Sequence, residues 1–536
     1  MAEHHQTLTI QQAIDLAAQH HKEGRLSQAE TAYQRILESD PNQPIALHLL
    51  GVVAHQTGKN DVAVDLITRA IAIDPDLAEA HSNLGTALRD LGKLEEAVTS
   101  YHKALALKPD YADAHNNLGN ALKDLGKPDE AVASYRKAFG LKPDFALAHS
   151  NLGNALRDLG KPEEAVASYH KALDLNPDYA DAHNNLGNAL KDLGKPEEAV
   201  ASYHKALNLK PDLAEAHNNL GNALRDLGKP EEAISSYQKA LNLKPDYVNA
   251  HNNLGLALRE LGRLEDALQI FESIDTPECY AHVLECLFAL GEYDKFYEKQ
   301  MASARNNEIN TRVAAINAFA SHQLNRSDPH PFCPTPLKFV RVCEPLDGVD
   351  DADGFLRDLM DDLQSREAIW EPPGKTTRHG FQTMSNLFKK PYGRLVELDR
   401  IIKDTIENYR FEFSSENCDF IKLFPKTLTL SGWFIRLIKG GHQAEHIHSG
   451  AWLSGIFYLQ MPKCTDQEEG SIELGLWGYD YPILNKSYPK NRFYPKNGSI
   501  ILFPSSLFHR TIPFHSDEER MSIAFDLRPT QTWRNI

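Results

Sequence analysis

The sequence has few of the features that mark secreted or membrane proteins. Only six of its 536 residues are cysteine, and they show neither CxxC spacing nor a disulfide-framework pattern. We therefore expect reduced thiols and a cytoplasmic protein. No stretch is apolar over about 18 residues, and the first residues lack the basic-then-apolar layout of a signal peptide. These absences predict that the chain neither enters nor crosses a membrane.

An excess of positive charge is also missing. The formal net charge is −17, and an acidic surface repels the phosphates of nucleic acids and of anionic lipids. We therefore expect no nucleic-acid partner and no membrane partner. At roughly 150 residues per domain, the length leaves room for three or four domains.

Glycine and proline recur in the first half of the chain with one fixed period. Glycines stand 34 residues apart at positions 24, 58, 92, 126, 160, 194, 228 and 262, and prolines do so at 41, 75, 109, 143, 177, 211 and 245. A fixed period in this range indicates a solenoid of stacked units. The glycine count gives eight units.

One unit, YADAHNNLGNALKDLGKPDEAVASYRKAFGLKPD, predicts a pair of short amphipathic helices. Gly126 ends the first helix, Pro128 suits the first turn of the second, and Pro143 stops that one. The apolar positions fall on one face of each helix: Ala114, Leu118, Ala121, Leu122 and Leu125 in the first, and Ala131, Tyr135 and Ala138 in the second.

Helices this short cannot bury their apolar faces alone, so the units must stack. The period, the glycine, the Ala/Tyr/Ala set and the closing proline resemble tetratricopeptide repeats from residue 7 to about residue 275. This half of the chain is therefore predicted to be an α-solenoid. A degenerate helix pair around CLFALGEYDKFYEK is expected to cap it.

The central units repeat an asparagine at one helical position: Asn83, Asn117, Asn151, Asn185, Asn219 and Asn253. Helix propensity does not select asparagine there, whereas a column of amides offers hydrogen bonds to the backbone of an extended peptide. The ladder resembles the one on the concave face of the repeats in O-linked N-acetylglucosamine transferases, which implies that it binds a substrate polypeptide. Duplication of a residue without a role and bonding between neighbouring units stay open as alternatives. A parallel column of histidines, which includes His81 and His115, is interpreted as packed or surface side chains.

The 34-residue period ends near residue 305. We divide the chain into repeats with their cap at 7–300, a helix and linker at 301–330, and a second folded unit at 331–536. That unit contains the strand-like LKFVRVCEP and two amphipathic helices, ADGFLRDLMDDLQSREAIW and GRLVELDRIIKDTIENYRFEF. Five strand candidates follow: GWFIRLIKGG, WLSGIFYLQMP, SIELGLW, GSIILFPS and RMSIAFDLRP. This order predicts an α+β domain around a sandwich or barrel.

A cluster of histidines lies between the first two of these strand candidates. On a strand, His446 and His448 share one face, while Glu445 and Ile447 point away. Two imidazoles at this spacing can bind one metal ion, and His509, just after the apolar strand 500–503, is the natural third ligand.

A guanidinium follows the third histidine at a short distance along the chain. Ten residues separate His509 from Arg520, and Ser522 lies on the same strand face as Arg520. An arginine beside a hydroxyl is suited to bind a carboxylate at two points.

This layout resembles that of the Fe(II)- and 2-oxoglutarate-dependent oxygenases, which have a double-stranded β-helix (jelly-roll) core. The resemblance covers 331–536, and His509 to Ser522 is its most specific part. It implies that His446 and His509 are Fe(II) ligands and that Arg520, helped by Ser522, binds the far carboxylate of the cosubstrate 2-oxoglutarate.

His448 departs from the family pattern, because the family has an acid at this position. The site is then either a three-histidine site, with His448 as a ligand, or a two-histidine site with water in the third place. Glu473 or Glu445 is a further candidate for an acidic ligand, although Glu445 lies on the wrong face of a regular strand.

These observations predict a 2-oxoglutarate-dependent dioxygenase that hydroxylates a protein or peptide held in the solenoid groove. Two alternatives stay open. One is a non-catalytic interaction scaffold with a degenerate oxygenase domain, which His448 favours. The other is an oxygenase that acts on a small molecule or saccharide, with the repeats serving only for assembly.

Overall fold

The computed structural model describes residues 9–274, 276–303, 310–328, 332–372, 375–464, 466, 468–485 and 487–530. The chain divides into two compact units, Met1–Asp212 and Leu213–Ile536. Parts of the predicted linker, residues 304–309 and 329–330, lie outside the described residues. Among the helices described, not one combines the length and the apolar character that crossing a bilayer requires.

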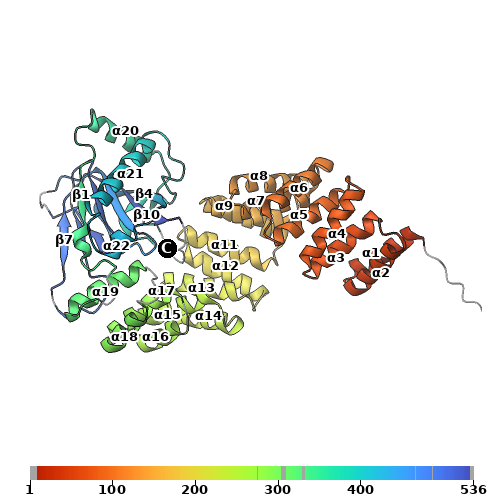
Figure 1. Cartoon of the computed structure of the whole chain (residues 1–536), viewed down its shortest axis with the longest axis horizontal. Coiled ribbons are helices and arrows are strands. Elements are labelled where there is room, and N and C mark those ends of the chain that lie inside the picture. Colours follow the sequence, from red (N-terminus) through yellow and green to blue (C-terminus); the bar gives the residue numbers. More distant parts are fainter. Residues whose placement is uncertain are drawn as a thin grey trace, which may run out of the picture. The chain divides into compact units, whose positions relative to one another are not determined.

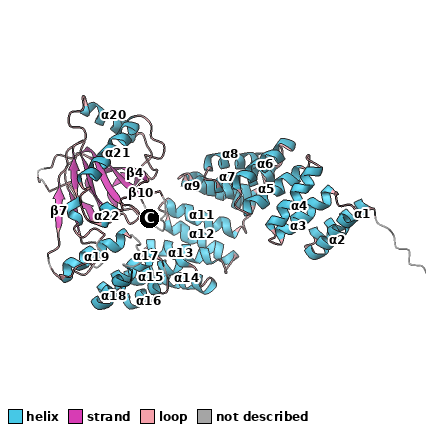
Figure 2. Ribbon diagram, in the orientation of Figure 1, coloured by secondary structure: helices cyan, strands magenta, loops and turns pink. Residues whose placement is uncertain are grey.

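The first compact unit consists of paired helices, one pair for each 34-residue repeat (Figures 1 and 2). Its helices are α1 (Ile10–Lys22), α2 (Leu26–Ser39), α3 (Pro44–Gln56), α4 (Asn60–Ile73), α5 (Ala78–Asp90), α6 (Leu94–Leu107), α7 (Ala112–Asp124), α8 (Pro128–Leu141), α9 (Ala146–Asp158), α10 (Pro162–Leu175), α11 (Ala180–Asp192) and α12 (Pro196–Leu209). The predicted α-solenoid is confirmed.

The second unit begins with the remaining repeats and three further helices. These are α13 (Ala214–Asp226), α14 (Pro230–Leu243), α15 (Val248–Glu260), α16 (Leu264–Glu272), α17 (Pro277–Ala289), α18 (Tyr293–Ser303) and α19 (Thr311–Leu324). Helices α17 and α18 form the pair expected after the eighth repeat. Helix α19 follows them and packs against α17.

Within a repeat, a glycine of the first helix makes room for an aromatic ring of the second. A Cβ atom on Gly119 would lie 2.5 Å from the Tyr135 ring, and Tyr135 is fully buried. Gly126, with a φ of +72°, follows the end of the first helix, as the sequence predicted. The close approach lets each short pair bury its apolar faces against its neighbours.

The rest of the second unit is an antiparallel β domain with a few helices. A seven-stranded sheet has the order β1-β8-β5-β10-β4-β3-β2, and a three-stranded sheet has the order β7-β6-β9. The strands are β1 (Arg341–Cys343), β2 (Ile369–Trp370), β3 (Thr377–Gln382), β4 (Leu428–Gln443), β5 (Leu453–Gln460), β6 (Ile472–Gly475), β7 (Lys490–Phe493), β8 (Ile500–Pro504), β9 (Phe508–Thr511) and β10 (Arg520–Pro529). This arrangement agrees with the predicted jelly-roll core.

Several local predictions for this domain need correction. The first predicted amphipathic helix, α20 (Ala352–Gln364), is shorter than expected, because Ile369 and Trp370 form strand β2 instead. The second, α21 (Arg394–Glu412), and the five main strands lie where the sequence placed them. Strand β4 extends at both ends beyond the predicted GWFIRLIKGG, and it passes through Gly440 at a φ of +78°.

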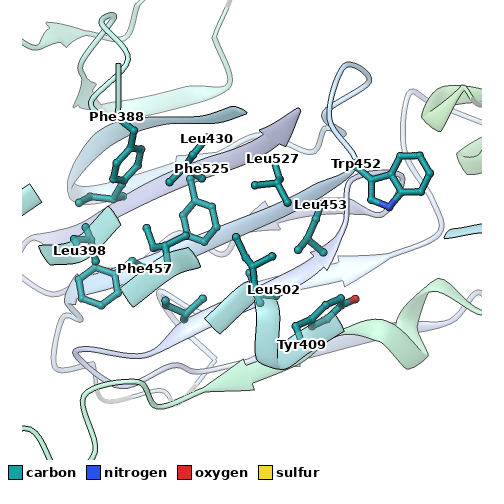
Figure 3. Close-up of a cluster of buried hydrophobic side chains, with 14 of the residues drawn as sticks. Phe388, Leu398, Tyr409, Leu430, Trp452, Leu453, Phe457, Leu502, Phe525 and Leu527 are labelled. Carbon is teal, nitrogen blue, oxygen red and sulfur yellow. The ribbon is translucent and has the colours of Figure 1, made fainter. Parts of the chain in front are cut away.

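The core of the β domain lies on one face of the large sheet. Alternate residues of β10, among them Phe525 and Leu527, pack with Phe457 of β5, Leu502 of β8 and Leu398 of α21 (Figure 3). The short helix α22 (Asp419–Lys422) and the 3₁₀ turn η1 (Pro336–Phe339) add Phe420 and Phe339. Because strand side chains alternate, the other residues of β10 face the opposite side of the sheet. That side carries the candidate site.

Candidate active site

The three predicted metal ligands converge. His446 follows the end of β4, and its backbone pairs with that of His509 in β9 through two hydrogen bonds of 3.1 and 3.0 Å. His448 lies two residues further on, and one nitrogen from each of the three rings lies within 4.8 Å of the others. His446 and His448 lie just beyond the end of β4, whereas His509 lies within β9, and Ile447 between the first two is buried. The pairing of the two sheets is therefore what joins the distant histidines.

The Nδ1 atom of each ring already has a polar neighbour. His446 Nδ1 lies 2.7 Å from the Ala444 carbonyl oxygen, and His509 Nδ1 lies 3.3 Å from that of Leu507. His448 Nδ1 contacts the Asp526 carboxylate. These contacts orient the rings and favour the Nε2 atoms as metal ligands.

Burial favours the neutral form of two of the three imidazoles, those of His446 and His509. Burial lowers the pKa of His446 to about 3, with a smaller contribution from His448. Burial likewise lowers the pKa of His509 well below its ordinary value. Neutral imidazoles are the form that binds a metal. This donor set suits Fe(II) or another divalent transition metal.

Asp526 is a site residue that the sequence analysis missed. Its carboxylate is 1% exposed. Besides His448, it accepts hydrogen bonds from Ser454 at 2.9 Å and Arg528 at 3.1 Å. Burial alone would raise its pKa, but His448 and the other donors hold it below its ordinary value. The alternation of side chains along a strand could have identified Asp526, because it lies an even number of residues from Arg520 and Ser522 and therefore on the same face of β10.

Arg520 is fully buried at the start of the same strand. Its Nε donates to the Gly470 carbonyl at 3.0 Å, and its Nη1 lies 3.4 Å from the Ser522 hydroxyl. Arg520 Nη2 and the nearby Tyr458 hydroxyl make no hydrogen bond of normal geometry in the described part of the chain. Because leaving buried polar atoms unpaired is costly, this pair suits an anionic ligand. A terminal carboxylate of 2-oxoglutarate fits such a site.

Neither of the two nearby glutamates is placed as a metal ligand. Glu473 lies on the outer face of β6, where it receives hydrogen bonds from Arg492 at 2.6 Å and Arg510 at 2.9 Å. The charged groups that act on Glu445 are Arg510, Glu473, Lys490 and Asp480, and the described cluster of possible ligands contains only the three histidines. Burial raises the pKa of Glu445 to about 7.

A cavity of about 610 Å³ opens beside the histidines. Its lining is mainly polar and includes Gln382, Thr383, Asn386, Ser431, Gln443 and Ser449. Trp433 also lines it, and its ring centroid lies 5.6 Å from that of His448. The cavity thus provides hydrogen-bonding groups next to the histidine cluster.

The repeated asparagines are half-buried. Asn151 donates to Asn116 of the preceding repeat at 3.0 Å, and Asn253 donates to Asn218 at 2.9 Å. The amide nitrogen of Asn83 lies 2.9 Å from His48 Nε2. These bonds agree with the alternative of bonding between neighbouring units, and the predicted peptide contact stays a prediction.

The histidine column has a structural role. In the repeats where the bond is described, the Nε2 atom of the histidine lies 2.8–3.0 Å from the carbonyl oxygen of the proline six residues earlier: His81, His115, His183 and His251.

Known families match both halves of the chain. Residues 431–526 match the family described as "Putative 2OG-Fe(II) oxygenase". Tetratricopeptide-repeat families match residues 16–78, 66–99 and five overlapping segments between 85 and 262. No curated protein matches the chain.

Several solved structures are similar to part of the chain. MamA is 30% identical over 31% of this chain and 96% of its own, with a TM-score of 0.28. YrrB, described as a TPR protein with an unusual peptide-binding site, is 26% identical over 35% of this chain and 96% of its own, with a TM-score of 0.30. PilF of Pseudomonas aeruginosa is 23% identical over 39% of this chain and 94% of its own, with a TM-score of 0.35. The family matches therefore show tetratricopeptide repeats over residues 16–262 and, near the C-terminus, a region that matches the family described as "Putative 2OG-Fe(II) oxygenase".

Proposed function

We propose that this protein is an Fe(II)- and 2-oxoglutarate-dependent dioxygenase that hydroxylates a protein or peptide substrate. The observation that carries the proposal is the convergence of His446, His448 and His509 on one point. The buried Arg520, whose Nη2 makes no hydrogen bond of normal geometry in the described part of the chain, follows on the same side of the sheet.

In this proposal the three imidazoles hold the metal, and their Nδ1 contacts keep the Nε2 atoms directed at it. Bound Fe(II) supplies the oxidising chemistry, in which O₂ decarboxylates 2-oxoglutarate to succinate and one oxygen atom enters a C–H bond. The protein's part is to order the ligands, exclude competing water and place the target carbon.

Arg520 binds the far carboxylate of 2-oxoglutarate in this proposal. The side chains that share its side of the large sheet include Ile435, Ile456 and Ala524, which are at most 4% exposed. Apolar walls around a buried guanidinium strengthen its attraction to a carboxylate, because little water screens the pair.

His448 replaces the acid of the family pattern, and Asp526 lies directly behind it. We propose that His448 is the third ligand and that Asp526 supplies the missing negative charge one bond further from the metal. A carboxylate that accepts from a metal-binding histidine raises the basicity of that ligand. The site would then keep its overall charge despite the substitution.

The substrate is proposed to be hydrophilic where it enters the cavity. The amides and hydroxyls of the lining, with the paired Asp526 and Arg528, favour a target that carries hydrogen-bonding groups over an aliphatic one. Tetratricopeptide repeats generally bind proteins or peptides, so we propose that the solenoid recruits the substrate chain and that the Asn83–Asn253 column contacts its backbone.

The alternative of a non-catalytic scaffold rests on His448, since three neutral ligands leave the metal without a directly bound protein anion. Succinate formation separates the two functions. We expect the purified protein to form succinate from 2-oxoglutarate only with Fe(II) and O₂, and His509→Ala to reduce the rate at least tenfold.

His515→Ala is the matched control, because His515 is an exposed histidine that pairs with Glu469. It should leave the rate unchanged. If the wild-type protein binds the metal but forms no more succinate than His509→Ala does, the result would support the scaffold and contradict the proposed activity.

A further inference from the structure

The backs of the two ligand segments are covered by one loop. Ile447 and Phe508 alternate with the histidines along the chain and are 7% and 1% exposed. Tyr479 and Tyr481, in the loop after β6, pack edge-on against Phe508, with centroid distances of 5.0 and 5.7 Å. The Tyr479 hydroxyl also interacts with the backbone of Ile447. A single loop therefore contacts both segments that carry the predicted ligands.

A buried carboxylate at the end of the solenoid holds this loop. Glu285 of α17 accepts a hydrogen bond from the Tyr481 hydroxyl at 2.9 Å. Arg312 of α19 donates to both of its oxygens, at 2.7 and 2.9 Å, and Arg259 and His282 complete its contacts. Burial alone would raise the pKa of Glu285, but these neighbours hold it well below its ordinary value. The cluster is thus an ionised network and not a neutral core contact.

Two residues of helix α19 contact the surroundings of the histidines, one through the Tyr479 loop and one through the segment that carries His446 and His448. The Arg312 guanidinium lies over the Tyr479 ring, 4.3 Å from its centroid. The adjacent Thr311 is fully buried and donates from its hydroxyl to the Ser449 carbonyl at 2.8 Å. Ser449 directly follows His448, so the first turn of α19 is bonded to the segment that bears two of the histidines.

The loop needs this support because its backbone is unfavourable by itself. Tyr479 and Asp480 have φ angles of 50° and 57°, a region that costs a residue with a side chain on the order of 1 kcal/mol or more. A Cβ on the preceding Gly478 would lie 2.0 Å from the Phe508 ring. A strained loop packed this closely keeps its shape only while its surroundings hold it.

We propose that Glu285 and Arg312 are positioning residues for the metal site. The proposal rests on the proposed function, since it requires the three histidines to bind the metal. The pair fixes Tyr479 and Tyr481 behind both ligand segments and thereby sets the separation of the imidazoles. Groups outside the ligand set that orient metal ligands typically change metal affinity about 10- to 100-fold when removed. The last helices of the solenoid would thus act on the metal site directly.

The test measures Mn(II) affinity and the visible spectrum of bound Co(II) in the full-length protein. Arg312→Ala should weaken Mn(II) binding at least tenfold and change the Co(II) spectrum. Tyr479→Phe removes only the hydroxyl that contacts Ile447 and should weaken binding about threefold or more. Glu260→Gln is the matched control, because it breaks another ion pair between repeats, with Arg225 at 3.7 Å. It should leave both readouts unchanged.

The outcomes separate this inference from the proposed function. If both variants bind Mn(II) within twofold of wild type with an unchanged Co(II) spectrum, the contacts are only stabilising and the positioning role is wrong. If Arg312→Ala does not fold, Tyr479→Phe alone decides. If wild type binds no Mn(II), or if His509→Ala binds it equally well, the proposed metal site fails instead.

Discussion

At the residue scale, the chemistry depends on a few buried side chains whose charges are balanced locally. In the proposed site, His448 stands where the family pattern has an acid, and the carboxylate of Asp526 contacts its Nδ1 atom. If His448 binds the metal, the charge of the site is kept although the ligand atom differs.

Asp526→Asn tests the carboxylate behind His448. The variant keeps the side-chain shape but loses the negative charge and the strong acceptor, so we expect Mn(II) affinity to fall about 10- to 100-fold. A competition titration with a chelator measures it. Asp517→Asn, which removes an exposed partner of Lys439, should have no effect. Equal affinity in both variants would remove Asp526 from the site.

Arg520→Ala tests the cosubstrate site. Charge-assisted hydrogen bonds contribute about 1.5–3 kcal/mol, so the dissociation constant for 2-oxoglutarate should rise at least tenfold. Calorimetry in the presence of Mn(II) measures it, and unchanged Mn(II) affinity in the same variant shows that the domain is folded. Cosubstrate affinity at the wild-type value would mean that the carboxylate binds elsewhere.

The buried neutral histidines predict a loss of stability in acid. The pKa of His446 is about 3 when folded, below the value of about 6.5 for a free imidazole. As the pH falls through about 6.5, the unfolded chain binds a proton that the folded chain does not, so stability is lost progressively toward the folded pKa.

The measurement is the thermal midpoint of the metal-free protein at pH 7 and pH 5. His446→Gln should lose less stability than wild type over this interval, by at most about 1.4 kcal/mol per pH unit. Other groups titrate in this window too, among them Glu445, whose pKa is raised to about 7, but they are the same in both proteins, so the difference between the two losses reports on His446. An equal loss in both proteins would show that His446 does not stay neutral.

At the element scale, two rules place almost everything that matters. Strand alternation puts Arg520, Ser522 and Asp526 on one face of β10 and the core residues on the other. In the repeats, the pairing of a helix glycine with a tyrosine ring sets how closely two helices approach.

Gly119→Ala tests the second rule. Helix propensity alone favours alanine over glycine by about 1 kcal/mol, but a Cβ here would lie 2.5 Å from the Tyr135 ring. We expect a net destabilisation of about 1–3 kcal/mol from overpacking. Thermal unfolding of the full chain shows whether Gly119→Ala lowers or raises the stability.

Gly140→Ala in the same repeat is the control. Gly140 is helical, and its Cβ would meet nothing within 4 Å, so the substitution should stabilise the protein slightly. A stabilising Gly119→Ala would show that the tyrosine ring moves aside without cost.

At the scale of the whole molecule, the last helices of the solenoid share one compact unit with the β domain. Residues 213–536 keep α17, α19 and the Glu285 contacts, whereas residues 331–536 lose them. We therefore expect the longer fragment to bind Mn(II) within twofold of the full chain, and the shorter fragment to bind it at least tenfold more weakly. Isothermal titration with Mn(II) measures both, and full affinity in the shorter fragment would contradict the role of α19.

The sequence by itself determined the repeats, the main strands and the identity of the three histidines, Arg520 and Ser522. These depend on local rules: a 34-residue period, alternation along a strand, and residue types with a fixed chemistry. The short strands β3, β7 and β9 escaped prediction, because TRHGFQ, KNRF and FHRT are largely polar and lack the apolar signal that marks the equally short β6 and β8.

Only the tertiary structure decided what lies around these residues. It brought Asp526 behind His448, removed Glu473 from the list of possible ligands, and placed Glu285 and Arg312 behind the ligand segments. Each of these contacts joins residues far apart in the chain, from 27 positions for Glu285 and Arg312 to 196 for Glu285 and Tyr481. No local pattern encodes such pairs, since they follow from how sheets and helices pack against one another.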